Sequence, residues 1–95
     1  MSDPLTSFNY PGKMFYVYIL QSLKDLRTYT GFTNNVDMRL HQHNSGQVTA
    51  TKYRRPFKIL FTEQFETSAG AKKRELYWKS GAGRRKLKEL FKYGQ

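Results

Sequence analysis

The spacing of apolar and polar residues divides the chain into segments of different period. Residues 15–22, FYVYILQS, and 27–33, RTYTGFT, are rich in aromatic and β-branched residues and are separated by the turn LKDL, which predicts a β-hairpin. The same composition predicts a third strand over 57–65, FKILFTEQF. Between them, 47–56 is polar, basic and ends in proline, so a loop is expected there.

The segment 34–46 changes to the period of a helix. Thr33 or Asn34 is expected to cap this helix, and Gly46 is expected to end it. At 100° per residue, four residues fall on one face, so that an arginine and a histidine share an apolar stripe: Val36, Arg39, Leu40 and His43.

Two further helices are predicted after the third strand. The first covers 69–79, with Thr67 or Ser68 as its cap and with Ala71, Glu75 and Trp78 on one face. Two glycines, Gly81 and Gly83, are expected to break it. The second covers 84–93, and its inward residues are expected to be Leu87, Leu90 and Phe91.

The resulting order ββαβαα predicts an α+β fold, a small three-stranded antiparallel or mixed sheet flanked by helices. We expect a single domain over 15–93. Residues 1–14 carry two prolines and no usable period, and are expected to form a flexible N-terminal extension.

Charge changes this picture by indicating a partner. The 17 Lys and Arg against 7 Asp and Glu give a formal charge of +10, which favours binding to a polyanion, first of all nucleic acid. No apolar run approaches the roughly 20 residues of a membrane-spanning helix. Without cysteine, disulfides and thiolate zinc sites are excluded. We expect a cytoplasmic monomer with no membrane partner.

Arg39 and His43 are the first candidates for chemistry. A guanidinium on the inner side of a helix requires an anionic partner, either a protein carboxylate or a ligand phosphate, unless its side chain reaches the helix edge. The histidine one turn later suggests two groups directed at one point.

Glu75 raises the matching question, since an inward carboxylate beside Trp78 must be paired, protonated or bound to a cation. A structural ion pair with Arg39 is one possibility. The other is a ligand of Mg²⁺, which typically takes only one or two protein carboxylates together with substrate phosphate.

The tyrosines of the hairpin are ordinary strand residues when read singly. Near an arginine, a histidine and a metal-binding carboxylate, however, two phenols would complete a phosphodiester-cleaving site. Basic residues in the loop and after position 71 predict a phosphate-contacting surface: Lys52, Arg54, Arg55, Lys72, Lys73, Arg74, Lys79, Arg84, Arg85 and Lys86.

Taken in order, YVY (16–18), YTG (29–31), NNVDMRLHQHNSG and AKKRELYWK resemble the GIY-YIG nuclease superfamily, in particular its small stand-alone bacterial branch, which is similar to the N-terminal domain of excinuclease C. The resemblance implies an endonuclease that hydrolyses phosphodiester bonds with Mg²⁺ or Mn²⁺. DNA is favoured over RNA as the partner, in repair or recombination. It implies these catalytic residues, with Glu75 also the metal ligand: Tyr18, Tyr29, Arg39, His43 and Glu75.

This sequence departs from the family pattern at three points. Tyr16 replaces the first-motif glycine, and Thr30 replaces the middle isoleucine of the second motif. Many members also carry an active-site asparagine after the glutamate, whereas no asparagine follows Asn44 here. Two alternatives therefore stay open: a non-catalytic nucleic-acid-binding module, and a structural or partner-binding domain in which Arg39 and Glu75 merely pair.

Overall fold

Three strands, three α-helices and one short 3-10 helix make up residues 14–91, the part of the chain that the computed structural model describes. In chain order they are β1 (Phe15–Ser22), β2 (Thr28–Thr33), α2 (Val36–Asn44), η1 (Thr49–Arg54), β3 (Phe57–Phe65), α3 (Ser68–Lys79) and α4 (Gly81–Phe91). The predicted order ββαβαα is confirmed. The expected extension, apart from Met14, and the last two residues of the predicted third helix lie outside the described residues.

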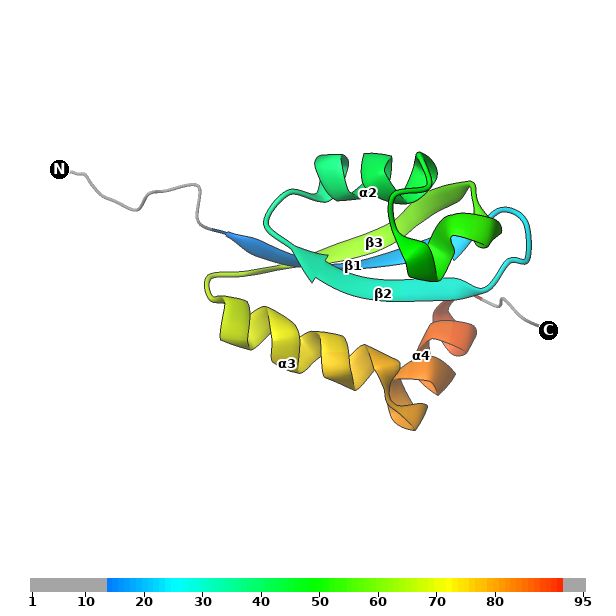
Figure 1. Ribbon diagram of the computed structural model, residues 1–95. Coiled ribbons are helices and arrows are strands. Elements are labelled where there is room, and N and C mark those ends of the chain that lie inside the picture. Colours follow the sequence, from blue (N-terminus) through cyan, green and yellow to red (C-terminus); the bar gives the residue numbers. More distant parts are fainter. Residues whose placement is uncertain (1–13, 92–95) are drawn as a thin grey trace, which may run out of the picture.

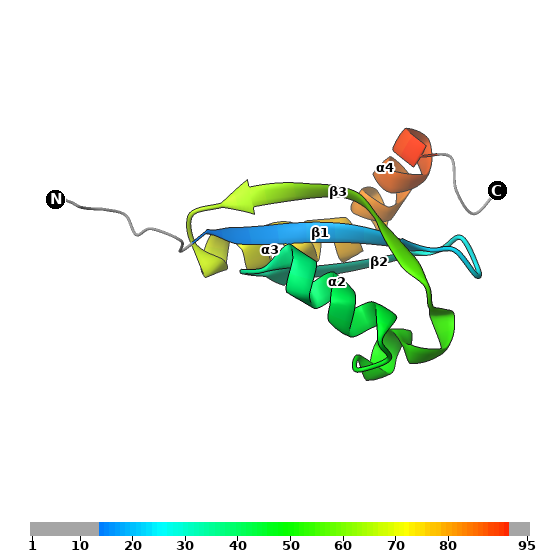
Figure 2. The ribbon, with the colours of Figure 1, turned by 90° about the horizontal axis from the view of Figure 1, so that it is seen from above.

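The sheet has the strand order β2-β1-β3, and β1 pairs antiparallel with both neighbours. The sheet is therefore antiparallel, not mixed. One face is covered by α2 and the other by α3 and α4 (Figure 1). Seen from above, β1 runs between its two partners as the central strand (Figure 2).

Successive side chains of β1 point to opposite faces of the sheet and so contribute to two separate cores. Val17 and Ile19 pack with α3 and α4, whereas Tyr18 and Leu20 pack on the side of α2. All four residues are buried. The central strand thus carries a tyrosine hydroxyl into the layer between sheet and helix, where a hydroxyl requires a hydrogen-bond partner.

A bulge interrupts the pairing of β1 with β3. Ile19 lies opposite Phe61 and Leu20 lies opposite Ile59, so Leu60 is an extra residue on β3. Leu60 and Phe61, although consecutive, therefore both pack against the core under α3 and α4.

The predicted N-cap of α2 is wrong, whereas that of α3 is confirmed. Asn35 caps α2 by accepting a bond from the Met38 amide at 3.0 Å, in place of the expected Thr33 or Asn34. Thr33 ends β2, and its hydroxyl accepts a bond from the Asn35 amide. Thr67 caps α3 as predicted, by accepting from the Gly70 amide at 3.0 Å.

Three other predictions of local structure are wrong. The expected loop 47–56 contains η1, which leaves only its flanks irregular. Helix α4 begins at Gly81, three residues earlier than predicted, because Ser80 supplies a cap by accepting from the Gly83 amide at 3.2 Å. Leu90, predicted to face inward, is 51% exposed, while Leu87 is buried as expected.

Gly83 is present because α4 crosses α3 at close range. A Cβ atom built on Gly83 would lie 2.6 Å from the Cα of Trp78 and would also meet the Tyr77 carbonyl oxygen, which are backbone atoms that cannot move aside. At Gly81, two residues earlier, the nearest atom is the end of the flexible Arg85 side chain at 3.5 Å.

These two glycines make a matched pair for a stability test. We expect Gly83→Ala to lower the free energy of unfolding by about 1 to 3 kcal/mol, since it forces the helices apart. Gly81→Ala should be neutral or stabilising by up to about 1 kcal/mol, because alanine favours the helix. Urea denaturation of both variants measures the difference, and equal stabilities would contradict the close crossing.

Candidate active site

The candidate site is built around one buried hydrogen bond between sheet and helix. The Tyr18 hydroxyl, from β1, lies 2.9 Å from Nε2 of His43, from the last turn of α2. Tyr18 is 2% exposed and His43 is 0% exposed. The structure therefore brings together two residues that are 25 positions apart in the sequence.

Arg39 approaches the same hydroxyl from one turn earlier in α2. Its Nε donates to the Tyr18 oxygen at 3.4 Å, and its Nη1 donates to Oε1 of Gln42 at 2.9 Å. Gln42 thus orients the guanidinium. The Arg39 side chain is part-buried, and its remaining donors are of the kind that bind an anion.

Aromatic rings enclose His43. The ring centroids of Tyr29, Tyr18 and Phe57 lie 4.9, 5.7 and 6.0 Å from that of His43. Tyr29 comes from β2, on the same face of the sheet as Tyr18. Gly31, directly opposite Tyr18, leaves the space that the Tyr18 phenol occupies, since a Cβ there would overlap the hydroxyl.

Thr51, from η1, closes the chain of hydrogen bonds behind His43. Its Oγ1 lies 2.8 Å from Nδ1 of His43 and donates its own proton to the Val48 carbonyl at 3.4 Å. Because that hydroxyl has one proton, it must accept from Nδ1–H. Nε2 is then the bare nitrogen of the neutral ring, and Tyr18 donates to it.

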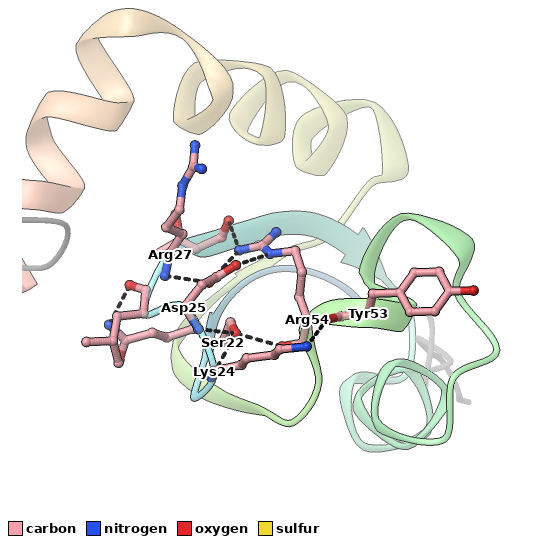
Figure 3. A network of polar contacts seen from close by, with 9 residues as sticks. Ser22, Lys24, Asp25, Arg27, Tyr53 and Arg54 are labelled. Carbon is pink, nitrogen blue, oxygen red and sulfur yellow. Dashed lines mark hydrogen bonds and ion pairs between the residues drawn. The ribbon is translucent and has the colours of Figure 1, made fainter.

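The β1–β2 turn fixes the position of η1 (Figure 3). Buried Ser22 donates to the Arg54 carbonyl at 2.6 Å, and Arg54 binds both carboxylate oxygens of Asp25, at 2.8 and 3.3 Å. The hydrogen bond from Arg54 holds the pKa of Asp25 well below its usual range. Lys24 adds a bond from Nζ to the Tyr53 carbonyl at 3.0 Å.

Burial shifts the pKa values of Tyr18 and His43 in opposite directions. It raises the pKa of Tyr18 above 10.0, although Arg39 acts against this shift. It lowers the pKa of His43 from 6.5 to about 4, and the positive charge of Arg39 lowers it further. At neutral pH both groups are therefore uncharged, which leaves Arg39 as the positive charge beside them.

Glu75 belongs to α3. Its carboxylate accepts from Lys79 Nζ at 3.0 Å, and its negative charge is the smallest of the contributions to the raised pKa of Tyr18. Among residues 14–91 no ion pair joins Glu75 to Arg39. The alternative of an Arg39–Glu75 pair is therefore wrong.

A metal at this site would rest on a single carboxylate. Within the described part of the chain, no group of three or more His, Cys, Asp or Glu side chains could hold an ion. The Glu75 side chain is 13% exposed, and a metal ion there would displace its ion-pair partner, Lys79. One carboxylate fits Mg²⁺ or Mn²⁺, which keep water and substrate phosphate as their other ligands.

The predicted nucleic-acid-binding cations are distributed over several surfaces. Arg54, Lys79 and Arg84 line a hollow beside β2. Arg74 instead forms a two-point ion pair with Glu63, at 3.0 and 3.1 Å, on the other side of α3. The others lie exposed on η1, α3 and α4 or at their ends: Lys52, Arg55, Lys72, Lys73, Arg85 and Lys86.

Sequence reasoning missed Gln42 and Thr51. The spacing of Gln42 from Arg39, i to i+3 on a helix, could have suggested their contact. For Thr51 no periodic signal exists, because it lies in a 3-10 turn within a polar segment. Only the tertiary fold shows that its hydroxyl is fully buried against His43.

Comparison with known proteins gives a consistent family. Residues 14–88 match the model of the GIY-YIG catalytic domain. A UPF0213 protein of Limosilactobacillus reuteri is 39% identical over 86 residues, covering 87% of this chain and 88% of the relative. A UPF0213 protein of Syntrophus aciditrophicus is 43% identical over 74 residues, covering 76% and 84%.

A solved structure is also similar. The solution NMR structure of a UPF0213 protein from Bacillus halodurans is 36% identical, with a TM-score of 0.49, and the match covers 82% of this chain and 85% of that one. Within residues 14–91, no helix has the length and apolar character that crossing a membrane requires.

Acid should destabilise the fold through His43. Below pH 6.5 the unfolded chain binds a proton on this side chain that the folded chain excludes down to about pH 4, so acid favours unfolding across that window. We expect about 3 kcal/mol to be lost between these limits. Urea titrations of the protein and of His43→Gln at several pH values measure it, and the same pH dependence in both would refute this assignment.

Thr51 should determine the tautomer of His43. We expect Thr51→Val to leave Nδ1–H without an acceptor, which costs about 1 to 3 kcal/mol of unfolding free energy and moves the proton to Nε2. Thr51→Ser should keep the native tautomer. ¹⁵N chemical shifts of the His43 ring report the position of the proton directly, and an unchanged tautomer in Thr51→Val would show that Thr51 serves only packing.

Proposed function

This chain belongs to the GIY-YIG family, and from that membership we propose that it is a divalent-metal-dependent endonuclease that hydrolyses phosphodiester bonds in nucleic acid, with DNA favoured. The observation that supports this most strongly is the convergence on the Tyr18 hydroxyl of groups suited to that reaction. His43 and Arg39 contact it directly, and Glu75 acts on it through its charge.

Arg39 would bind the scissile phosphate. Gln42 fixes one terminal nitrogen at 2.9 Å, so the guanidinium is held in place before substrate arrives. Among the described residues it has no carboxylate partner, and a phosphate is the anion that its planar donors fit. Arg39 can therefore offset the charge that develops on the phosphoryl oxygens.

Glu75 would hold the metal. A divalent cation there would polarise the phosphate and neutralise charge on the leaving oxygen. The Lys79–Glu75 bond must open for this, which frees the lysine for a neighbouring phosphate.

Tyr18 and His43 would move the proton of the attacking water. Because burial raises the pKa of Tyr18, the phenol keeps its proton at neutral pH and accepts another only as it gives its own away. His43 Nε2, at 2.9 Å, is the acceptor. The water proton passes to Tyr18 while the tyrosine proton passes to His43, and the low pKa of His43 favours returning it afterwards.

The substrate itself would assist this transfer. The charge of Arg39 contributes to the low pKa of His43. A phosphate bound to Arg39 neutralises that charge and so raises the basicity of the histidine when a proton has to be accepted. Tyr29, against the ring of His43, would orient the water or the phosphate.

The second candidate is a non-catalytic nucleic-acid-binding module. What favours it is the missing asparagine after Glu75, since Asn44 cannot substitute for it. The Asn44 side chain is occupied by the Phe57 backbone, donating to its carbonyl at 3.1 Å and accepting from its amide at 2.7 Å. The predicted basic surface would suffice for binding alone.

A cleavage assay separates the two candidates. Labelled single-stranded and duplex DNA are incubated with Mg²⁺ and the purified protein. We expect Glu75→Gln and Arg39→Gln each to reduce the rate by about 10²-fold or more, because each removes stabilisation of transition-state charge. Tyr18→Phe should cost about 10²-fold or more by removing the proton relay.

Lys58→Gln serves as the matched control, because Lys58 is exposed on β3 and belongs to no part of the site. It should cleave as the unmodified protein does. Equal residual cleavage by the protein and Glu75→Gln would identify a contaminant and refute the nuclease. Salt-sensitive binding without any cleavage would instead establish the binding module.

A further inference from the structure

A basic hollow lies beside the outer strand of the hairpin, next to the candidate active site. It has a volume of about 800 Å³, and we refer to it as the β2 groove. Its walls come from the β1–β2 turn and β2, from η1, and from α3 and α4: Asp25, Arg27, Thr28, Tyr29, Thr30, Arg54, Trp78, Lys79, Arg84 and Lys88.

The charge of the β2 groove is strongly positive. It contains five cationic side chains and one carboxylate, Asp25, which is already paired with Arg54 at 2.8 Å. Within residues 14–91, no acidic side chain lies within ion-pair distance of the other cations of the turn and of α4, which are Arg27, Arg84 and Lys88. An anionic ligand would therefore find unneutralised charge on two walls.

The two basic walls face each other. In Figure 3 the Arg27 side chain points away from Asp25 and Arg54, toward the yellow and orange helices α3 and α4. Arg84 and Lys88 are one turn apart on α4 and both line the groove. A chain of phosphates lying between the walls could thus be contacted from both sides.

Tyr29 connects the β2 groove to the active site. Its ring lies against His43, with centroids 4.9 Å apart, and the same residue lines the groove. Lys79 makes a second connection, since it lines the groove and bonds Glu75 at 3.0 Å. A ligand in the groove would therefore be continuous with one bound at Arg39 and Glu75.

The β2 groove has room for a short segment of one strand. About 800 Å³ is within the range of pockets that hold a drug-sized molecule, which is enough for a few nucleotides. Cations together with an aromatic side chain are the combination by which proteins bind unpaired strands, and half-buried Tyr29 is among the residues that line the groove.

We propose that the β2 groove binds a single-stranded segment of nucleic acid that continues from the scissile phosphate. The proposal rests on the proposed nuclease function and names the form of substrate that this site would hold. Phosphates contact Arg27, Arg84 and Lys88, and a base lies on Tyr29. A substrate with an unpaired segment next to the cut is then preferred to a continuous duplex.

Binding in the absence of metal tests this separately from cleavage. Fluorescence anisotropy in EDTA compares a labelled single-stranded oligonucleotide with the duplex of the same sequence, using the full chain. We expect Arg84→Gln and Lys88→Gln each to weaken single-strand binding by about fivefold. Each should also reduce the slope of log K against log salt by about 0.7, the value for one lost phosphate contact.

Lys58→Gln is again the matched control, with the same charge change on β3, at the far edge of the sheet. Its single-strand affinity should stay that of the unmodified protein. Circular dichroism confirms that all variants remain folded. A loss in the control equal to that in the groove variants would overturn the proposal, since it would show attraction by net charge alone.

Two other outcomes would also overturn it. Equal losses for single strand and duplex would show that the groove does not select an unpaired strand, and competition by polyglutamate as strong as by oligonucleotide would indicate an acidic protein as the occupant. If the protein does not cleave but still binds single strands selectively, the nuclease proposal is contradicted and the proposal for the groove is supported. If it cleaves while the groove variants bind normally, only the proposal for the groove is contradicted.

Discussion

The hydrogen bond between Tyr18 and His43 is the interaction on which the rest of the structure depends. It joins the central strand to the helix that covers it, and both side chains are buried in the layer between them. There an unpaired hydroxyl or imidazole nitrogen would cost about 1 to 3 kcal/mol, so each group holds the other in place. The same burial keeps His43 neutral and Tyr18 protonated, and thereby sets the starting state of any proton transfer between them.

Several elements serve this one contact. Gly31 leaves room for the phenol, and Thr51 accepts the hydrogen bond from Nδ1 of His43. The Asp25–Arg54 ion pair fixes η1, the 3-10 helix that carries Thr51. Residues from β1, β2, α2 and η1 therefore act together. The arrangement explains how a domain of this size can hold a polar pair in its interior: each polar atom in the chain of bonds has a partner.

The sequence was sufficient for the architecture because its periods are clear. Strands 15–22 and 57–65 were correct to the residue, and the stripe on α2 placed Arg39 and His43 on one side. What it could not provide came from tertiary contacts. The position of η1 depends on side chains of a distant turn, the start of α4 depends on Ser80 and on a close helix crossing, and the Leu60 bulge leaves no mark on the alternation. For the site, helical periodicity indicated Arg39, His43 and Glu75, and the resemblance to the GIY-YIG family selected Tyr18 and Tyr29. The direction of the hydrogen bonds around His43 required Thr51.

The space beside Gly31 couples positions 18 and 31, although they lie on different strands. Because the Tyr18 phenol fills the volume of a missing side chain on the opposite strand, neither position can change alone without a clash or a void. A chain that exchanged this tyrosine for a smaller residue would gain room for a larger one at 31, and the reverse order would pass through an overpacked intermediate. Substitutions at these two positions therefore depend on each other. The order in which they occur decides whether the intermediate protein folds.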